Sequence, residues 1–123
     1  MIKGVGVDLI EISRVRRVMV SNPRFAEKIF TGKEIDYCRS KHKKEVHYAA
    51  RFAAKEAFFK ALGTGWRYGM KWQEIAIDND SLGKPQIAIS GKVSEYFIRQ
   101  KLTRIHLSIS HTRSHAVALV VIE

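Results

Sequence analysis

The chain has 123 residues, of which 46% are hydrophobic and 28% charged, a balance typical of a globular domain and not of a disordered chain. This length holds one core, so we expect a single domain over residues 1–123, with any bulky substrate at its surface or between subunits. Twenty-two Lys and Arg against twelve Asp and Glu give a formal charge of +10, which indicates a negatively charged partner.

We expect neither a membrane partner nor a secreted protein. No apolar run approaches the roughly 20 residues that span a bilayer, and the first residues lack the pattern of a signal peptide. The one cysteine, Cys38, has no partner for an internal disulfide, which is typical of a reducing compartment. The cytoplasm is therefore the expected location.

The first part of the chain predicts a strand followed by short helices. Residues 2–10 are mostly apolar and β-branched, which predicts a buried strand. Residues 11–20 have apolar side chains at helical spacing. Asn22-Pro23 is typical of a helix start, and Thr31 with Glu34 fits a capping box that opens another short helix.

The clearest prediction is a long helix over residues 45–62, rich in alanine and closed by Gly63. Phe52 and Phe59 lie nearly opposite a stripe of small apolar residues, formed by Val46, Ala50, Ala53, Ala57 and Ala61. A helix that is apolar on both sides is buried within the fold or against a neighbouring subunit.

The second half of the chain predicts mainly strands. In chain order we expect a strand at 74–77, a turn at 79–84, a strand at 86–90, a helix at 93–101 and strands at 105–110 and 116–122. A tight polar turn joins the last two strands, so they should be antiparallel. We therefore predict a compact α+β domain with a mainly antiparallel sheet and a long central helix.

Asp8 stands inside the first predicted strand, where a carboxylate is costly unless it is hydrogen-bonded, paired or bound to a metal. Gly4 and Gly6 share its face of the strand and leave room for a ligand or another backbone. The alternative is that Asp8 ends the strand and caps the following helix.

Glu56 and Lys60 are four residues apart, so their side chains are neighbours at the edge between the two apolar sides of the long helix. In a partly desolvated setting the carboxylate can hold a cation and the lysine can meet a phosphate. The alternative is a surface ion pair worth a few tenths of a kcal/mol.

Two turns offer further polar groups. Residues 108–115 place hydroxyls, backbone N–H groups, Arg113 and imidazoles where they could surround an anion; the alternative is an ordinary polar hairpin. Gly83-Lys84-Pro85 is a turn by its residue types, and a phosphate contact there is the second possibility.

Two carboxylates and a lysine near a basic surface indicate a hard cation together with phosphate. Mg²⁺ commonly takes one or two protein carboxylates and completes its octahedron with water and phosphate oxygens. No Walker loop, dinucleotide fingerprint, zinc pattern or nucleophile-elbow serine offers a competing site.

Four segments together resemble the motifs of the 4′-phosphopantetheinyl transferase superfamily, in its short holo-acyl-carrier-protein synthase branch. They are GVGVDLIEISRV at 4–15, RFAAKEAFFKALGTG at 51–65, GKP at 83–85 and SISHT at 108–112. The central segment is the most specific, and the resemblance covers nearly the whole chain. Trp66-Arg67 departs from the family pattern, which has smaller or apolar residues there, and could alter the rim of the site or the carrier preference.

The resemblance implies that the phosphopantetheine arm of coenzyme A is transferred to a serine of apo acyl carrier protein, with release of adenosine 3′,5′-bisphosphate, in support of fatty acid biosynthesis. It implies Mg²⁺ held by Asp8 and Glu56, with Lys60 at a phosphate. Glu56 is also our hypothesis for the base, acting directly or through a water. The resemblance also implies a set of contacts to coenzyme A, in which Arg51 is the weaker candidate. The set is Arg51, Lys60, Gly83, Lys84, Pro85, Ser110, His111 and Thr112. It further implies a homotrimer with active sites at subunit interfaces.

Acyl carrier proteins are acidic, and this explains the basic charge better than nucleic acid does. Arg14 and Arg17, one turn apart in the first predicted helix, and Arg24 beyond them are the residues expected to bind the carrier. The competing interpretation is a small basic RNA- or DNA-binding module, favoured by the charge and by scattered aromatic residues. The sequence lacks an RNP-like strand, a KH loop and a dsRBD signature, and this interpretation leaves Asp8 unexplained, so no nucleic-acid partner is expected.

Overall fold

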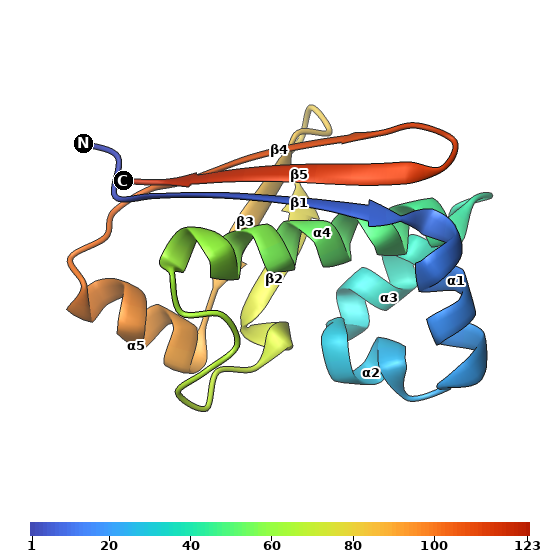
Figure 1. Ribbon diagram of the computed structural model, residues 1–123, viewed down its shortest axis with the longest axis horizontal. Coiled ribbons are helices and arrows are strands. Elements are labelled where there is room, and N and C mark those ends of the chain that lie inside the picture. Colours follow the sequence, from blue (N-terminus) through green and yellow to red (C-terminus); the bar gives the residue numbers. More distant parts are fainter.

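The structure, a computed structural model, describes all 123 residues. It is an α+β fold in which every strand pair is antiparallel, as predicted, although the strands divide between two sheets. The two termini lie side by side (Figure 1). The elements in chain order are β1 (Gly4–Glu11), α1 (Ile12–Ser21), α2 (Phe25–Ile29), α3 (Gly32–Arg39), α4 (Lys44–Leu62), the 3-10 helix η1 (Trp72–Glu74), β2 (Ile75–Asn79), β3 (Pro85–Ile89), α5 (Gly91–Arg99), β4 (Ile105–His111) and β5 (His115–Ile122).

The three-stranded sheet has the order β1-β5-β4, and α4 lies along one face of it (Figure 1). β5 is the central strand, with Ala118 opposite Asp8 of β1 and Val117 opposite Ser110 of β4. The hairpin of β2 and β3 forms the second sheet. Helices α1, α2 and α3 gather near one end of α4 and α5 lies near the other.

The two faces of β1 differ sharply in burial. Gly6 is buried and points toward α4, whereas Val5, Val7 and Leu9 on the other face are 57%, 54% and 66% exposed. The prediction that this strand is buried is therefore wrong for its outer face, because no element of the chain covers that side of the sheet. Leu119 of the central strand is exposed on the same side.

Gly4 and Gly6 allow α4 to lie directly against β1. A Cβ atom at Gly4 would overlap the carbonyl oxygen of Ala61, and one at Gly6 would overlap that of Ala57. The prediction that these glycines admit a close backbone is confirmed. This close approach sets the height of α4 relative to Asp8, which follows on the same face of the strand.

Helix α4 is buried on both sides within its own chain. Its alanine stripe packs on the sheet, whereas Phe58 and Phe59 belong to a core shared with β2 and α5. The helix ends at Gly63, whose φ of 79° is left-handed, as the sequence predicted. A neighbouring subunit is therefore not needed to cover α4, and the uncovered apolar surface is that of the sheet.

Local sequence motifs predicted where the shorter helices begin, to within a few residues. The capping box of Thr31 and Glu34 is present at the start of α3. The helix after Asn22-Pro23 begins at Phe25, because the Asn22 side chain accepts a hydrogen bond from the Arg24 N–H and holds a turn there. None of the helices is long and apolar enough to cross a membrane.

Candidate active site

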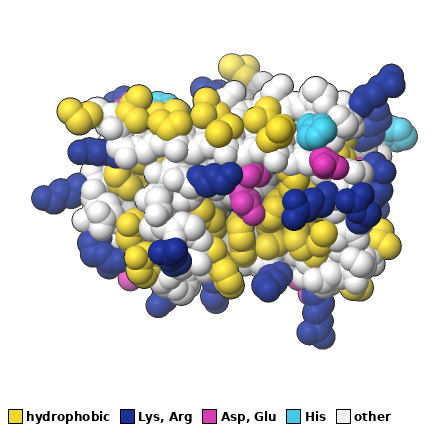
Figure 2. Space-filling view, in the orientation of Figure 1, with side chains coloured by type: hydrophobic (Ala, Val, Ile, Leu, Met, Phe, Trp, Pro, Cys, Tyr) yellow, Lys and Arg dark blue, Asp and Glu magenta, His cyan; other side chains and the backbone are white.

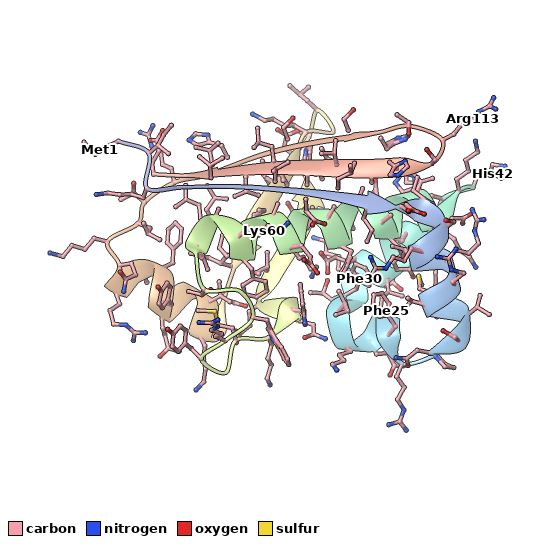
Figure 3. All side chains as sticks on the ribbon, viewed as in Figure 1. Met1, Phe25, Phe30, His42, Lys60 and Arg113 are labelled. Atoms are coloured by element: carbon pink, nitrogen blue, oxygen red, sulfur yellow. The ribbon has the colours of Figure 1, made fainter.

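Asp8 and Lys60 meet where β1 crosses α4. The Lys60 ammonium lies 3.2 Å from Asp8 Oδ1 and donates to the Val7 carbonyl oxygen at 3.1 Å, and Figure 3 places Lys60 on the part of α4 beneath β1. The Asp8 side chain is 14% exposed and that of Lys60 is 54% exposed. The carboxylate is thus held from the protein side, while the ammonium still faces solvent.

Both sequence alternatives for these residues fail. β1 continues three residues beyond Asp8, and no side chain caps the start of α1, so Asp8 is not a helix cap. Lys60 pairs across to Asp8 and makes no ion pair with Glu56 on its own helix. The strand and the helix therefore bring together groups that are distant in sequence.

Glu56 lies beside Asp8 at the wall of one cavity of about 340 Å³. Burial raises the pKa of Glu56 above its usual value, and the negative charge of Asp8 raises it further, while Lys60 and Arg14 act in the opposite direction. Two carboxylates close enough to repel each other are a setting in which a bound cation is stabilised.

Six of the nine residues that line this cavity are hydrophobic. Apart from Asp8, Glu56 and Arg14 it is lined by hydrophobic residues of β1, α1, α2 and α4: Leu9, Ile10, Val15, Val18, Phe25 and Phe52. In Figure 2 acidic side chains lie at the centre of this face, with hydrophobic side chains below them and Lys and Arg around them. A ligand here would have its charged part at the carboxylates and its apolar part against Phe25 and Phe52.

A second polar group forms away from this cavity. Arg51 is 5% exposed, with its guanidinium carbon 4.0 Å from the centre of the Tyr37 ring and its Nε without a hydrogen-bond partner. The pKa of His47 is lowered, first by burial and then by the charges of Arg51, Lys41 and His111. Arg51 and His111, both predicted to contact coenzyme A, therefore lie near His47.

The other predicted coenzyme A contacts do not line the cavity of Asp8 and Glu56. Ser110 is exposed on β4, on the same outer side of the sheet as Ser108. Thr112 organises the β4–β5 turn, where its hydroxyl accepts the backbone N–H groups of Ser114 and His115. Gly83-Lys84-Pro85 forms the β2–β3 turn, with Gly83 at a φ of 86°.

The predicted carrier-binding arginines are all exposed. Arg14 reaches the cavity of Asp8 and Glu56, which places it at the rim of the candidate site. Arg17 follows one turn later on α1, and Arg24 precedes α2.

The sequence analysis missed a buried ion pair next to the site. Lys55 is fully buried, and its ammonium donates to Glu34 Oε1 at 2.8 Å and to the Trp72 carbonyl oxygen at 3.1 Å. Glu34 Oε2 accepts the Ile77 N–H, so the pair joins α3, α4 and β2. The sequence could have indicated that Lys55 is buried, because it precedes Phe59 by four residues and so lies on an apolar side of the helix.

The chain is similar to known proteins over almost its whole length. The family model described as "4'-phosphopantetheinyl transferase superfamily" matches residues 4–120. The chain is 48% identical over 124 residues to the holo-[acyl-carrier-protein] synthase of Geotalea daltonii, covering 100% of this chain and 99% of that protein. It is 45% identical to the synthase of the same name from Geobacter sulfurreducens, with 100% and 98% covered.

Solved structures show the same likeness. The holo-[acyl-carrier-protein] synthase of Neisseria meningitidis has a TM-score of 0.93 at 36% identity, with 100% of this chain and 99% of that chain covered. The Helicobacter pylori synthase, solved in complex with coenzyme A, has a TM-score of 0.84 at 29% identity, with 97% and 99% covered. With a full-length sequence match and the same fold, this chain belongs to the 4′-phosphopantetheinyl transferase superfamily.

Proposed function

We propose that this chain transfers the 4′-phosphopantetheine group of coenzyme A to a serine of apo acyl carrier protein, with Mg²⁺ held by Asp8 and Glu56. The observation that carries the proposal is that Asp8 and Glu56 line one cavity, with Lys60 paired to Asp8, in a chain of this superfamily. Relatives along the full length are named holo-[acyl-carrier-protein] synthase, and the Helicobacter pylori structure holds coenzyme A.

The donor set fits Mg²⁺. Two carboxylates from β1 and α4 lie close enough for Asp8 to raise the pKa of Glu56, and such crowding is relieved by a divalent cation. Two protein oxygens leave most of an octahedron for water and substrate phosphate, as is usual for this ion. When bound, Mg²⁺ would neutralise pyrophosphate oxygens and stabilise the departing phosphate.

The reaction is a displacement at phosphorus. The serine oxygen of the carrier forms a bond to the phosphorus that bears the pantetheine, and the pyrophosphate P–O bond breaks to release adenosine 3′,5′-bisphosphate. Lys60, fixed by Val7 and Asp8 yet half exposed, places positive charge where negative charge develops. Glu56 is the base in this proposal, acting directly or through a water, because its carboxylate lies beside Asp8 in the wall of the cavity.

Coenzyme A is proposed to bind between copies of the chain in a homotrimer. Ser110, Thr112 and the Gly83–Pro85 turn do not line the cavity of Asp8 and Glu56, which supports a substrate site completed by a second copy. The exposed Val5, Val7, Leu9 and Leu119 form the apolar outer face of the sheet that a second copy would cover. The nucleotide half then comes from the neighbouring copy.

Arg51 and His111 belong to that nucleotide half. The cations around His47 repel its protonated form, and a phosphate of coenzyme A would compensate this excess of positive charge. The unpartnered Arg51 Nε offers a donor there.

The carrier is proposed to bind at Arg14, Arg17 and Arg24, which are exposed and basic as an acidic partner requires. Arg14 also lines the cavity, which places the bound carrier next to Glu56. We further propose a cytoplasmic enzyme that supports fatty acid biosynthesis, in keeping with a cysteine that stays a buried thiol because burial raises its pKa to about 11.

Intact-mass spectrometry tests this function. Apo acyl carrier protein is incubated with this chain, coenzyme A and Mg²⁺, beside a sample with EDTA. A gain of about 340 Da that EDTA abolishes is the expected result. An unchanged carrier mass, with several carriers tried and with coenzyme A giving no thermal stabilisation of the chain, would refute the proposal.

A further inference from the structure

A rigid pair of tryptophans lies in and after the loop that joins α4 to η1. Trp66 is 56% exposed and stacks on Trp72, with ring centroids 6.4 Å apart and planes 22° apart. Trp72 is itself fixed by Phe59 at 5.1 Å and by Phe52 at 5.6 Å. The exposed indole of Trp66 is therefore held on a packed support rather than free in a loop.

This pair forms one wall of a groove of about 540 Å³, which we call the Trp66 groove. It is lined by Lys28, Trp66, Lys71, Trp72 and Gln73, with no acidic side chain among them. The Gln73 amide donates to the carbonyl oxygens of Glu27 at 2.6 Å and Lys28 at 2.7 Å. These bonds tie the end of α2 to η1, so the two sides of the groove are held in place.

Aromatic side chains connect the Trp66 groove with the cavity of Asp8 and Glu56. Phe52 lines that cavity together with Phe25, whose ring lies 5.7 Å away, and Phe52 also contacts Trp72 of the groove. A row of aromatic rings thus leads from the carboxylates to Trp66. Figure 3 shows Phe25 below α4, on the side away from the sheet.

We propose that the Trp66 groove is a second docking surface for the acidic carrier protein and that Trp66 helps to select the carrier. The inference rests on the proposed function. Arg14, a proposed carrier contact, lines the cavity of Asp8 and Glu56, and Phe52 of the same cavity contacts Trp72 of the groove. A carrier bound over Glu56 would then contact both Arg14 and the Trp66 groove.

The chemistry of the groove fits one kind of partner. Lys28 and Lys71 offer two cations to acidic side chains, and the indole of Trp66 offers a flat apolar surface between them. Tryptophan is among the residues that most often dominate binding energy at interfaces.

Steady-state kinetics tests the inference in Trp66→Ala and in the double variant Lys28→Glu/Lys71→Glu. We expect the KM for apo carrier to rise about tenfold in each, with the KM for coenzyme A unchanged. Trp66→Tyr keeps an aromatic ring on Trp72 and should retain most of the affinity. Equal thermal unfolding temperatures show that each variant folds.

Two control variants make the same kinds of substitution, aromatic to alanine and lysine to glutamate, outside the Trp66 groove. Tyr68 is 64% exposed in the same loop but stacks on Tyr96 at 5.8 Å, so Tyr68→Ala should leave both KM values unchanged. Lys101→Glu changes the net charge as each lysine reversal does, at an exposed residue just after α5, and separates local contact from overall charge.

The results distinguish the inference from the function on which it rests. An active enzyme whose carrier KM is unchanged in Trp66→Ala overturns the docking surface alone. A rise in the KM for coenzyme A instead would assign the groove to the pantetheine arm and also overturn it. Absence of transfer by the unaltered chain to any carrier would overturn both.

Discussion

Alternating residues of β1 give the two faces of this strand different roles. On the inner face, Gly4 and Gly6 let α4 approach the sheet and Asp8 meets Lys60. On the outer face, Val5 and Val7 project from the sheet and remain exposed. Because successive side chains of a strand point to opposite faces, Asp8 lies on the face that meets α4, and the exposed apolar residues lie on the other face.

Under the proposed function, the residues expected to bind substrate lie in two separate places on the chain. The inner face and α4 form the cavity of Asp8 and Glu56, whereas the predicted nucleotide contacts gather at the β4–β5 turn and beside Arg51. In the proposed homotrimer, a second copy packed on the outer face would supply the nucleotide contacts. Substitutions on the two faces should therefore have different effects.

Loss of either carboxylate at the cavity, Asp8 on the inner face of β1 or Glu56 on α4, should abolish most of the activity. We expect Asp8→Asn and Glu56→Gln each to lower kcat by about 10³-fold, because each removes charge that holds Mg²⁺ and, for Glu56, the base. Steady-state kinetics with isothermal titration of coenzyme A measures both properties. A Glu56→Gln variant that loses only metal or coenzyme A binding would show that Glu56 is a ligand and not the base.

A methyl group on the inner face should damage the fold. Gly6→Ala places a Cβ against the Ala57 carbonyl oxygen, and we expect it to lower the free energy of unfolding by about 3 kcal/mol. Gly32→Ala is the matched control, because nothing lies within 4 Å of a Cβ there. Its effect should stay within about 0.5 kcal/mol. Equal effects in urea denaturation would contradict the close packing of α4 on β1.

A charge on the outer face should act on assembly and not on folding. Val7 lies opposite Leu119 in the sheet, so Val7→Glu places a charge in the apolar surface that a second copy would cover. Light scattering should show a smaller assembly, with activity reduced about 10²-fold, since a buried unpaired charge is costly. Ile98→Glu, at an exposed residue of α5, is the control and should change neither the assembly nor the activity. An assembly of unchanged mass would place the interface elsewhere.

Charge reversal on α1 should have the smallest and most selective effect. Arg14→Glu/Arg17→Glu is expected to raise the KM for the carrier about tenfold, through lost and reversed charge attraction, with the KM for coenzyme A unchanged. The difference should shrink at high salt. A carrier KM that stays constant would remove these arginines from the docking surface.

Local sequence signals predicted most of the fold. The alanine stripe and Gly63 placed α4 within one residue of its observed start, and the capping box placed α3. These features depend on residues close in sequence, and so they are visible without the structure. The exposure of Val5, Val7 and Leu9 was not predicted, because alternation cannot show whether a second layer covers an apolar face.

The site was predicted in its residues but not in its contacts. Asp8 stood out because a carboxylate in an apolar strand needs a partner, yet the partner, Lys60, lies 52 residues away and was paired with Glu56 instead. The buried Lys55–Glu34 pair depends on contacts among three elements. Long-range pairings of this kind follow from tertiary packing and leave little trace in local spacing.

Mixing two inactive variants tests most directly whether the active site forms between copies. Asp8→Asn lacks the metal half, and Lys84→Glu/His111→Ala lacks the nucleotide half. In mixed assemblies with random subunit order, about a quarter of the sites combine two intact halves, so we predict recovery of about a quarter of the normal activity. No recovery, although both variants copurify in one assembly, would show that each site is built within a single chain and would contradict this account.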